Sequence, residues 1–250
     1  MMRPALLLSS LAALALALAA CDRKAEETAG PPPPEAKASP ADAAIASAGA
    51  AVDAVTEAGP ASPAPGEQDG TDQWRKVAGA EDQDRIARLY GAWGAALNEA
   101  NVDYGAMIDT HGMLLVPKAA LAGNLQPGPG IYRCRTIKLG SMDGKGLAYV
   151  DYPWFKCSIE LTPGGDLILT KTTGSQRLRG LLYPDGSGQN RLVFIGAQAW
   201  GADEKGFPTY GQMPERDQVG VFERIGTNRW RLALPWPKQE SKLDVLELKR

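Results

Sequence analysis

Residues 155–161 read Phe-Lys-Cys-Ser-Ile-Glu-Leu, and this short stretch decides the fold class of the chain. Its odd-numbered residues are apolar and its even-numbered residues are polar. Because successive side chains of a strand point to opposite faces, this alternation is typical of an antiparallel strand with one buried face. The stretch therefore predicts a sheet that covers a core on one side.

The same period of two recurs through the second half of the chain, with no helix-length pattern between the repeats. Most connections are short and rich in Gly, Asp, Asn and Pro, as in hairpins. Eight sequential antiparallel strands predict an up-and-down barrel or a strongly curled sheet, because closure removes the exposed strand edges. A β-sandwich is the alternative, and in either case the class is mainly β (α+β). The expected strands are 131–139, 148–161, 166–173, 176–183, 191–199, 218–225, 229–235 and 243–249.

A helical pattern precedes the strands. In residues 81–100, large apolar side chains recur at spacings of three and four, and acidic residues occupy the first turn. We expect one amphipathic helix here, capping a barrel mouth or packing on its flank. Pro117 is well placed to open a second, short helix. The Gln-Pro-Gly-Pro-Gly run at 126–130 ends the helical part.

The N-terminus has the pattern of an export signal: Met-Met-Arg-Pro is followed by an Ala- and Leu-rich run that ends at Cys21. Leu18-Ala19-Ala20-Cys21 resembles the lipobox of bacterial lipoproteins. The sequence thus predicts a signal peptide over 1–20 and a lipidated Cys21 carrying palmitate. An uncleaved anchor helix is the alternative, although the run is short for a membrane span.

The predicted location is the cell envelope, with the protein facing the periplasm. Two or three acyl chains on one cysteine give stable anchoring. Asp22 resembles a signal that retains lipoproteins in the inner membrane, and the outer membrane is the alternative.

Residues 21–71 are Ala-, Pro- and Gly-rich, and all aromatic residues of the chain lie at or after Trp74. Such a segment cannot bury a core, so it predicts a disordered acidic tether; a proline-rich ligand for an SH3-like partner is the alternative. Residues 72–250 are expected to form one globular domain, helical over 72–125 and β over 130–250. That domain lacks the dense basic footprint that nucleic-acid binding requires.

The cysteines agree with an exported protein. With Cys21 lipidated, Cys134 and Cys157 remain as a pair in an oxidising compartment. Their midpoint lies beside the turn at 143–146, so a hairpin there brings the two strands into near-opposite register. We therefore predict a Cys134–Cys157 disulfide, which contributes about 3 kcal/mol in the chain-entropy estimate. Free redox thiols are disfavoured because no CxxC spacing is present.

Several strings in this region are similar to an uncharacterised family of Gram-negative envelope proteins, a domain of unknown function. The resemblance implies a secreted location and no catalytic activity. The strings are YRCRTIKLG (132–140), YPWFKC (152–157), GSQRLRGLLYP (174–184), RLVFIGA (191–197) and RWRLALPWPKQESKLDVLEL (229–248).

Catalytic and cofactor signatures are sparse. His111 is the one histidine, so a multi-histidine metal site is excluded and a catalytic triad has only this residue to use. Within Asp-Thr-His-Gly, 109–112, it is first interpreted as a polar turn residue. The sequence has no phosphate loop, EF-hand or GxGxxG motif. It therefore predicts no metal site and no cofactor, and whether the protein is an enzyme stays uncertain, with a non-enzyme favoured.

Three Arg-x-Arg pairs are the first candidate contact residues. On a strand both members of a pair share one face. The simpler interpretation places the middle residue inward and the arginines on a solvated outer face. The functional alternative is a cationic stripe for an anionic partner, since the planar guanidinium binds carboxylates and phosphates bidentately. The pairs are Arg133 and Arg135, Arg177 and Arg179, and Arg229 and Arg231.

The longest connection between strands, 201–217, is the second candidate. Asp203, Tyr210 and Arg216 provide charge and stacking surface for a sugar or a peptide. The simpler interpretation is a surface loop that covers a barrel mouth. Glu240 is expected at the same end.

Three functions compete. A non-enzymatic binding module, which captures a small amphiphilic or anionic ligand, ranks first. A structural or assembly partner of another envelope protein ranks second. A hydrolase that uses carboxylates on envelope material ranks third, and it requires two carboxylates near one another across a cleft.

Overall fold

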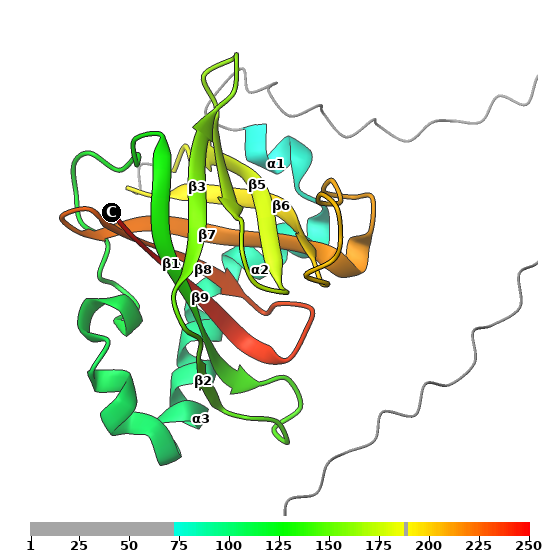
Figure 1. Cartoon of the computed structure of the whole chain (residues 1–250). Helices are drawn as coiled ribbons and strands as arrows, with labels where there is room; N and C mark the ends of the chain where they lie inside the picture. The colour runs from blue at the N-terminus through cyan, green and yellow to red at the C-terminus, as the bar shows by residue number, and fades with distance from the viewer. Residues whose placement is uncertain (1–72, 188–189) are drawn as a thin grey trace, which may run out of the picture. The chain divides into compact units, whose positions relative to one another are not determined.

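The computed structural model describes residues 73–187 and 190–250. The predicted signal peptide, Cys21 and the predicted tether therefore lie outside the described residues. Figure 1 shows the helices followed by the strands. The helices are α1 (Gln73–Val77), α2 (Ala80–Ala87) and α3 (Leu89–Asp109), with short 3₁₀ helices η1 (Gly112–Leu115) and η2 (Pro214–Arg216). The strands are β1 (Gly130–Ser141), β2 (Tyr149–Asp151), β3 (Phe155–Leu161), β4 (Leu167–Lys171), β5 (Arg177–Pro184), β6 (Leu192–Ala199), β7 (Asp217–Gly226), β8 (Arg229–Pro235) and β9 (Ser241–Lys249).

The strands form a closed antiparallel barrel. Strands β3 to β9 pair in sequence order, β1 pairs with β3, and β1 also pairs with β9, from Arg133↔Lys249 to Ser141↔Ser241. This last pairing closes an eight-stranded barrel, with β2 as a further strand outside it. The barrel prediction is confirmed, and the β-sandwich alternative is wrong.

The single strand expected over 148–161 is two strands. The first half of β1 pairs with β3 and its second half pairs with β2, so that β2 lies beyond the end of β3 in Figure 1. Residues 152–154 separate the two. Pro153 has no amide hydrogen and interrupts the ladder, which leaves β2 free to diverge from the barrel.

The predicted disulfide is confirmed. Cys157 stands opposite Tyr132 and Cys134 stands opposite Phe155, so the two cysteines are diagonal neighbours on β1 and β3. Their Cα atoms lie 5.8 Å apart and the sulfur atoms are bonded. Both side chains point into the barrel and have no exposed surface.

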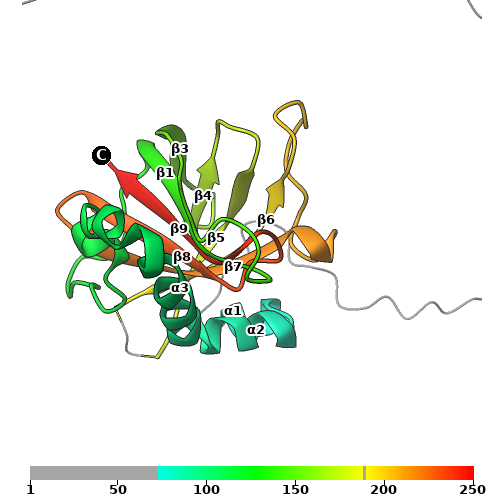
Figure 2. The ribbon, with the colours of Figure 1, turned by 90° about the horizontal axis from the view of Figure 1, so that it is seen from below.

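The helices pack on the flank of the barrel and do not cap a mouth. Figure 2 shows the helices on one side of the barrel; α1 contacts β5, α2 contacts β7, and α3 contacts β1, β9 and β8. Leu89, Trp93 and Ala96 form one buried cluster with outward-facing residues such as Ile137 and Val245. The barrel interior forms a second, separate cluster. The outer face of the helix-covered strands is therefore apolar as well, and these strands are buried on both faces.

Two helix predictions are corrected. The expected helix at 81–100 is interrupted at Arg88, whose φ of -89° and ψ of 17° are not helical, and α3 continues to Asp109. The helix expected from Pro117 is wrong, because η1 forms before it and ends at Leu115. Val116 is extended, as the residue before a proline usually is.

Glu99 fastens α3 to the barrel. Its Oε1 accepts hydrogen bonds from the amide and the hydroxyl of Ser141, at 2.9 and 2.6 Å, and its other oxygen pairs with Lys242. These contacts, led by the Lys242 hydrogen bond, lower the pKa of Glu99 to about 2. Among the residues that the structure describes, no helix has the length and apolar character needed to cross a membrane.

Candidate functional site

One end of the barrel interior is closed. Trp230 and Tyr132 lie there, edge to face, with ring centroids 5.8 Å apart. The Trp230 indole donates to the carbonyl of Leu125 at 2.8 Å, and the Tyr132 hydroxyl donates to the carbonyl of Gly128 at 2.5 Å. The segment that precedes β1 is thus held at this end by aromatic side chains.

The other end of the interior contains a cavity of about 290 Å³. This volume lies at the lower limit of ligand pockets, which range over roughly 300–1,000 Å³. Both polar and apolar side chains line the cavity, and in the strand register Leu234 stands opposite Asp244 and Leu178 opposite Gln198. The apolar lining residues are Phe155, Leu178, Leu234 and Leu246.

Lys138 lies in this cavity with carboxylate partners that balance its positive charge. Its Nζ lies 2.5 Å from a carboxylate oxygen of Glu240 and 3.8 Å from one of Asp244. Burial alone would lower the pKa of Lys138, but the two carboxylates outweigh burial and raise it. Burial likewise raises the pKa of Asp244, against the opposing effect of Lys138 and of a hydrogen bond from Ser241. Lys138 therefore stays protonated and is matched by carboxylates on its own side of the cavity.

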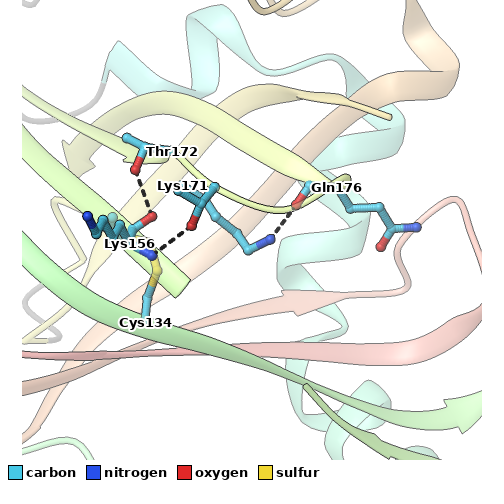
Figure 3. The surroundings of a disulfide bond; sticks show 7 residues. Cys134, Lys156, Lys171, Thr172 and Gln176 are labelled. Carbon is cyan, nitrogen blue, oxygen red and sulfur yellow. Dashed lines mark hydrogen bonds between the residues drawn. A yellow bond between two sulfur atoms is a disulfide. The ribbon is translucent and has the colours of Figure 1, made fainter. Parts of the chain in front are cut away.

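Lys171 has no such match. The side chain lies at the cavity wall with its ammonium 4.0 Å from the centroid of the Phe155 ring, and the residue is 4% exposed. The ammonium donates to the carbonyl of Gln176 at 2.7 Å, as Figure 3 shows, and among the described residues no carboxylate pairs with it. Burial, followed by repulsion from Lys138 and Arg177, lowers its pKa to about 8. At neutral pH Lys171 is thus a mostly protonated, buried cation without a counter-ion.

A pair of glutamines faces the same space. Gln218 is 3% exposed and donates to the side-chain oxygen of Gln198 at 3.3 Å, which leaves its own Oε1 without a partner. Rotating both amides by half a turn preserves their mutual bond and leaves an NH₂ group unpaired instead. Buried amides normally have all their partners, so this group favours a polar occupant.

Together these side chains make a small pocket with a partly apolar lining, an ammonium that no carboxylate of the described residues pairs with, and an unpaired amide atom. Such a pocket can hold the head of a small amphiphilic molecule. Lys138, Lys171, Asp244, Gln198 and Gln218 were not predicted as site residues. A signal for the two lysines exists, because Lys138 shares the inward parity of Cys134, and Lys171 that of Leu169.

A family of proteins can be recognised from the body of the chain. Residues 74–248 match the domain of unknown function DUF4893. The chain belongs to the DUF4893 family. No curated protein and no solved structure matches the chain. Membership shows no activity, so the geometry of this DUF4893 domain carries the functional argument.

The first two arginine pairs point out of the barrel, as the parity of their strands requires. Arg133 and Arg135 both stack on Trp154, at 4.7 and 4.8 Å from the ring centroid. Arg177 donates to the carbonyls of Gly201 and Glu204, and Arg179 donates to Thr170. These arginines do not line the cavity.

Arg231 departs from the solvated outer face that the simpler interpretation expects. It points outward but is fully buried, because the segment after α3 crosses over it. Its guanidinium pairs with Glu223 at 2.7 Å and donates to the backbone carbonyls of Leu114, Val116 and Pro117. In this DUF4893 domain the Arg231 side chain supplies the hydrogen bonds that a neighbouring strand would otherwise give to the backbone carbonyls of this irregular segment.

The loop between β6 and β7 contributes no residue to the lining of the barrel cavity. Tyr210 donates to Asp82 at 2.5 Å and accepts from the amide of Gly79, which fastens the loop to α2 outside the barrel. Arg216 pairs with Glu204 at 2.7 Å and stacks on Trp200.

Two predicted contact residues remain to be placed. Asp203 is exposed in that same loop. Glu240 lies at the rim of the cavity, at the end of the barrel where β6 connects to β7. Of the contact residues predicted from the sequence, it is the one that lines the cavity.

His111 lies in a turn, as the sequence predicts, and its side chain is buried. Its Nδ1 lies 3.1 Å from Arg135 and its Nε2 lies 2.7 Å from the hydroxyl of Tyr149 and 3.5 Å from Asp151. Because arginine can only donate, Nδ1 is the acceptor and Nε2 carries the proton of the neutral ring. Burial and then Arg135 lower the pKa of His111. The residue thus joins the end of α3 to β1 and β2, away from the cavity.

The carboxylates of the cavity do not form the facing pair that a hydrolase needs. Glu240 and Asp244 lie on one wall and both contact Lys138. Within 73–187 and 190–250, no three His, Cys, Asp or Glu side chains are grouped so as to hold a metal ion.

Proposed function

We propose that this protein is a lipid-anchored binding module of the cell envelope, which holds a small amphiphilic ligand in the mouth cavity of its barrel. The cavity is the observation that carries the proposal. A barrel filled by side chains, with an apolar or basic patch outside, would have favoured an assembly partner instead.

Three properties of the cavity support binding. Its apolar lining offers Leu178, Leu234 and Leu246 to the body of a ligand. Its polar lining holds an ammonium that no carboxylate of the described residues pairs with, and an amide atom without a hydrogen-bond partner. Its walls are strands of a closed barrel, which keep a pocket preformed and reduce the entropy lost on binding.

The envelope location in the proposal comes from the N-terminal sequence. Leu18-Ala19-Ala20-Cys21 carries the pattern of a lipidation site. Replacing Cys21 with Ser is expected to abolish incorporation of labelled palmitate and retention in the membrane fraction. Unchanged labelling would defeat the lipoprotein part of the proposal and leave the cavity argument intact.

Ligand binding is tested with three fluorinated probes of similar size that differ in their head group: 4-fluorobenzyl alcohol, 4-fluorobenzoate and 4-fluorobenzylamine. The full chain is placed in phospholipid nanodiscs, and the ¹⁹F line width and shift of each probe are titrated. We expect saturable binding of at least one probe.

Substitution of Ser175 by Trp provides the blocking variant, because Ser175 is exposed at the rim and lines the cavity. Thr172→Trp is the matched control, since Thr172 is exposed on the same turn but does not line the cavity. Binding should be lost in Ser175→Trp and kept in Thr172→Trp. If none of the probes binds, or if both variants bind equally, the cavity is not a binding site and the proposal is wrong.

A further inference from the structure

Resting on the proposed function, we infer that the ligand is a small monocarboxylic acid whose carboxylate pairs with Lys171 and whose apolar body lies against Leu178, Leu234 and Leu246. The ligand class follows from the charges of the cavity, which are unevenly distributed.

The Lys171 ammonium calls for a negative partner. It has three N–H donors and, among the described residues, one acceptor, the carbonyl of Gln176. The charged groups that act on it are Lys138 on β1 and Arg177 on β5, and both repel it. A buried ammonium without a counter-ion is costly, and an incoming anion removes that cost. A neutral or cationic head group would leave the cost in place.

The glutamine pair completes the recognition of an oxygen anion. The structure records Oε1 as the unpaired atom of Gln218; rotating both amides keeps the bond to Gln198 and would place an NH₂ donor there, on β7. A carboxylate has two oxygens and accepts from donors on different sides. Lys171 on β4 and Gln218 on β7 are contributed by different parts of the barrel wall, and both line this cavity.

The carboxylates of the cavity limit the ligand to one negative charge. Glu240 and Asp244 both contact Lys138, two carboxylates against one ammonium, so this side of the cavity has no positive charge left for a ligand. A phosphate dianion would have one ammonium left to pair with and two carboxylates nearby to repel it. A monocarboxylate matches the single unpaired cation.

The apolar half of the lining requires an apolar body on the acid. Leu178, Leu234 and Leu246 point inward from β5, β8 and β9 and line the cavity beside its polar side chains. Burying a hydrocarbon body there is favourable by roughly 25 cal/mol per Å² of apolar surface. A volume of about 290 Å³ admits a small aromatic or short-chain acid.

The probe set tests this inference separately from the proposed function. With the full chain in nanodiscs, 4-fluorobenzoate should bind at least about tenfold more tightly than the alcohol or the amine, a difference of about 1.4 kcal/mol. Lys171→Met should remove this preference. Lys156→Met is the matched control, because Lys156 is exposed on the adjacent strand β3, and it should keep the preference.

The pH profile adds a readout that a merely structural role of Lys171 would not move. Fluorobenzoate stays ionised throughout, whereas Lys171 loses its proton above its pKa of about 8. The affinity should therefore fall about tenfold between pH 7 and pH 9, since each pKa unit corresponds to a factor of ten. Lys138 has a raised pKa and stays charged across this range. The Lys171→Met protein should show no such fall.

The outcomes separate cleanly. If the alcohol or the amine binds as tightly as the benzoate, or if Lys171→Met keeps the preference, the inference about the acid is wrong and the binding function stands. If no probe binds the wild-type chain, both are wrong.

Discussion

His111 and Tyr149 join two elements that lie far apart in the sequence: the His111 Nε2 atom is 2.7 Å from the Tyr149 hydroxyl, on the outer face of the barrel. Tyr149 belongs to β2, the strand outside the barrel, and its ring stacks on Tyr104 of α3 at 5.3 Å between centroids. Both partners of the bond are buried. This contact joins the end of α3 to β2, the described strand that is not part of the closed barrel.

The first prediction concerns pH. The pKa of His111 is lowered in the folded protein, chiefly by burial, so below the ordinary value of 6.5 the unfolded chain binds more protons than the folded one. The free energy of unfolding should therefore be insensitive to His111 above about pH 6.5 and fall as the pH drops below it. Urea denaturation from pH 8 to pH 5 measures this.

His111→Gln is the control, because His111 is the only histidine of the chain and glutamine does not titrate. The groups that face the imidazole are Arg135, Asp151, Glu247 and Arg229, and they remain in the variant. The difference between wild type and variant should shrink toward low pH. Parallel pH curves would contradict the assignment.

The second prediction concerns Arg231, which pairs with the buried Glu223 and holds three backbone carbonyls. Arg231→Met should lower the free energy of unfolding by about 3–5 kcal/mol, because it leaves a buried carboxylate without its partner. Arg133→Met removes an exposed arginine from the same outer face and should cost less than about 1 kcal/mol. Equal losses in urea denaturation would refute a special role for Arg231.

The third prediction compares two glycines. A Cβ atom at Gly196 would lie 2.1 Å from the carbonyl oxygen of Arg179 and 2.6 Å from the Cα of Gly180, so β5 and β6 approach too closely for a side chain. Gly196→Ala should destabilise the fold by about 3 kcal/mol or more. Gly94→Ala in α3 meets nothing within 4 Å and should stabilise it by up to about 1 kcal/mol. Thermal unfolding of both variants checks the opposite signs.

The fourth prediction concerns the disulfide inside the barrel. Reducing the Cys134–Cys157 bond should lower the free energy of unfolding by about 3 kcal/mol in the chain-entropy estimate. Denaturation with and without reductant measures the loss, and the Cys134→Ala/Cys157→Ala double variant should no longer respond to reductant. A wild-type chain that is indifferent to reductant would show that the bond does not stabilise the fold.

The sequence by itself determined the strands and their inward faces. Alternation in 155–161 placed Cys157 and Ile159 inside, and the turn at 143–146 put Cys134 and Cys157 near one another. These inferences succeed because a period of two is a local property of an extended chain. Pro153 is also a local signal, since it cannot donate a hydrogen bond to a neighbouring strand. The division of residues 148–161 into two strands became clear only from the pairing of β1 with both β2 and β3.

Tertiary structure alone decided which polar residues share a site. Lys138, Lys171 and Glu240 come from three separate segments, and the closure of β1 on β9 brings Glu240 and Asp244 to Lys138 while leaving Lys171 without a carboxylate. Arg231 is buried only because the segment after α3 crosses it. The charge balance of a buried side chain depends on its neighbours across the barrel, and those neighbours are set by closure, not by any pattern along the chain.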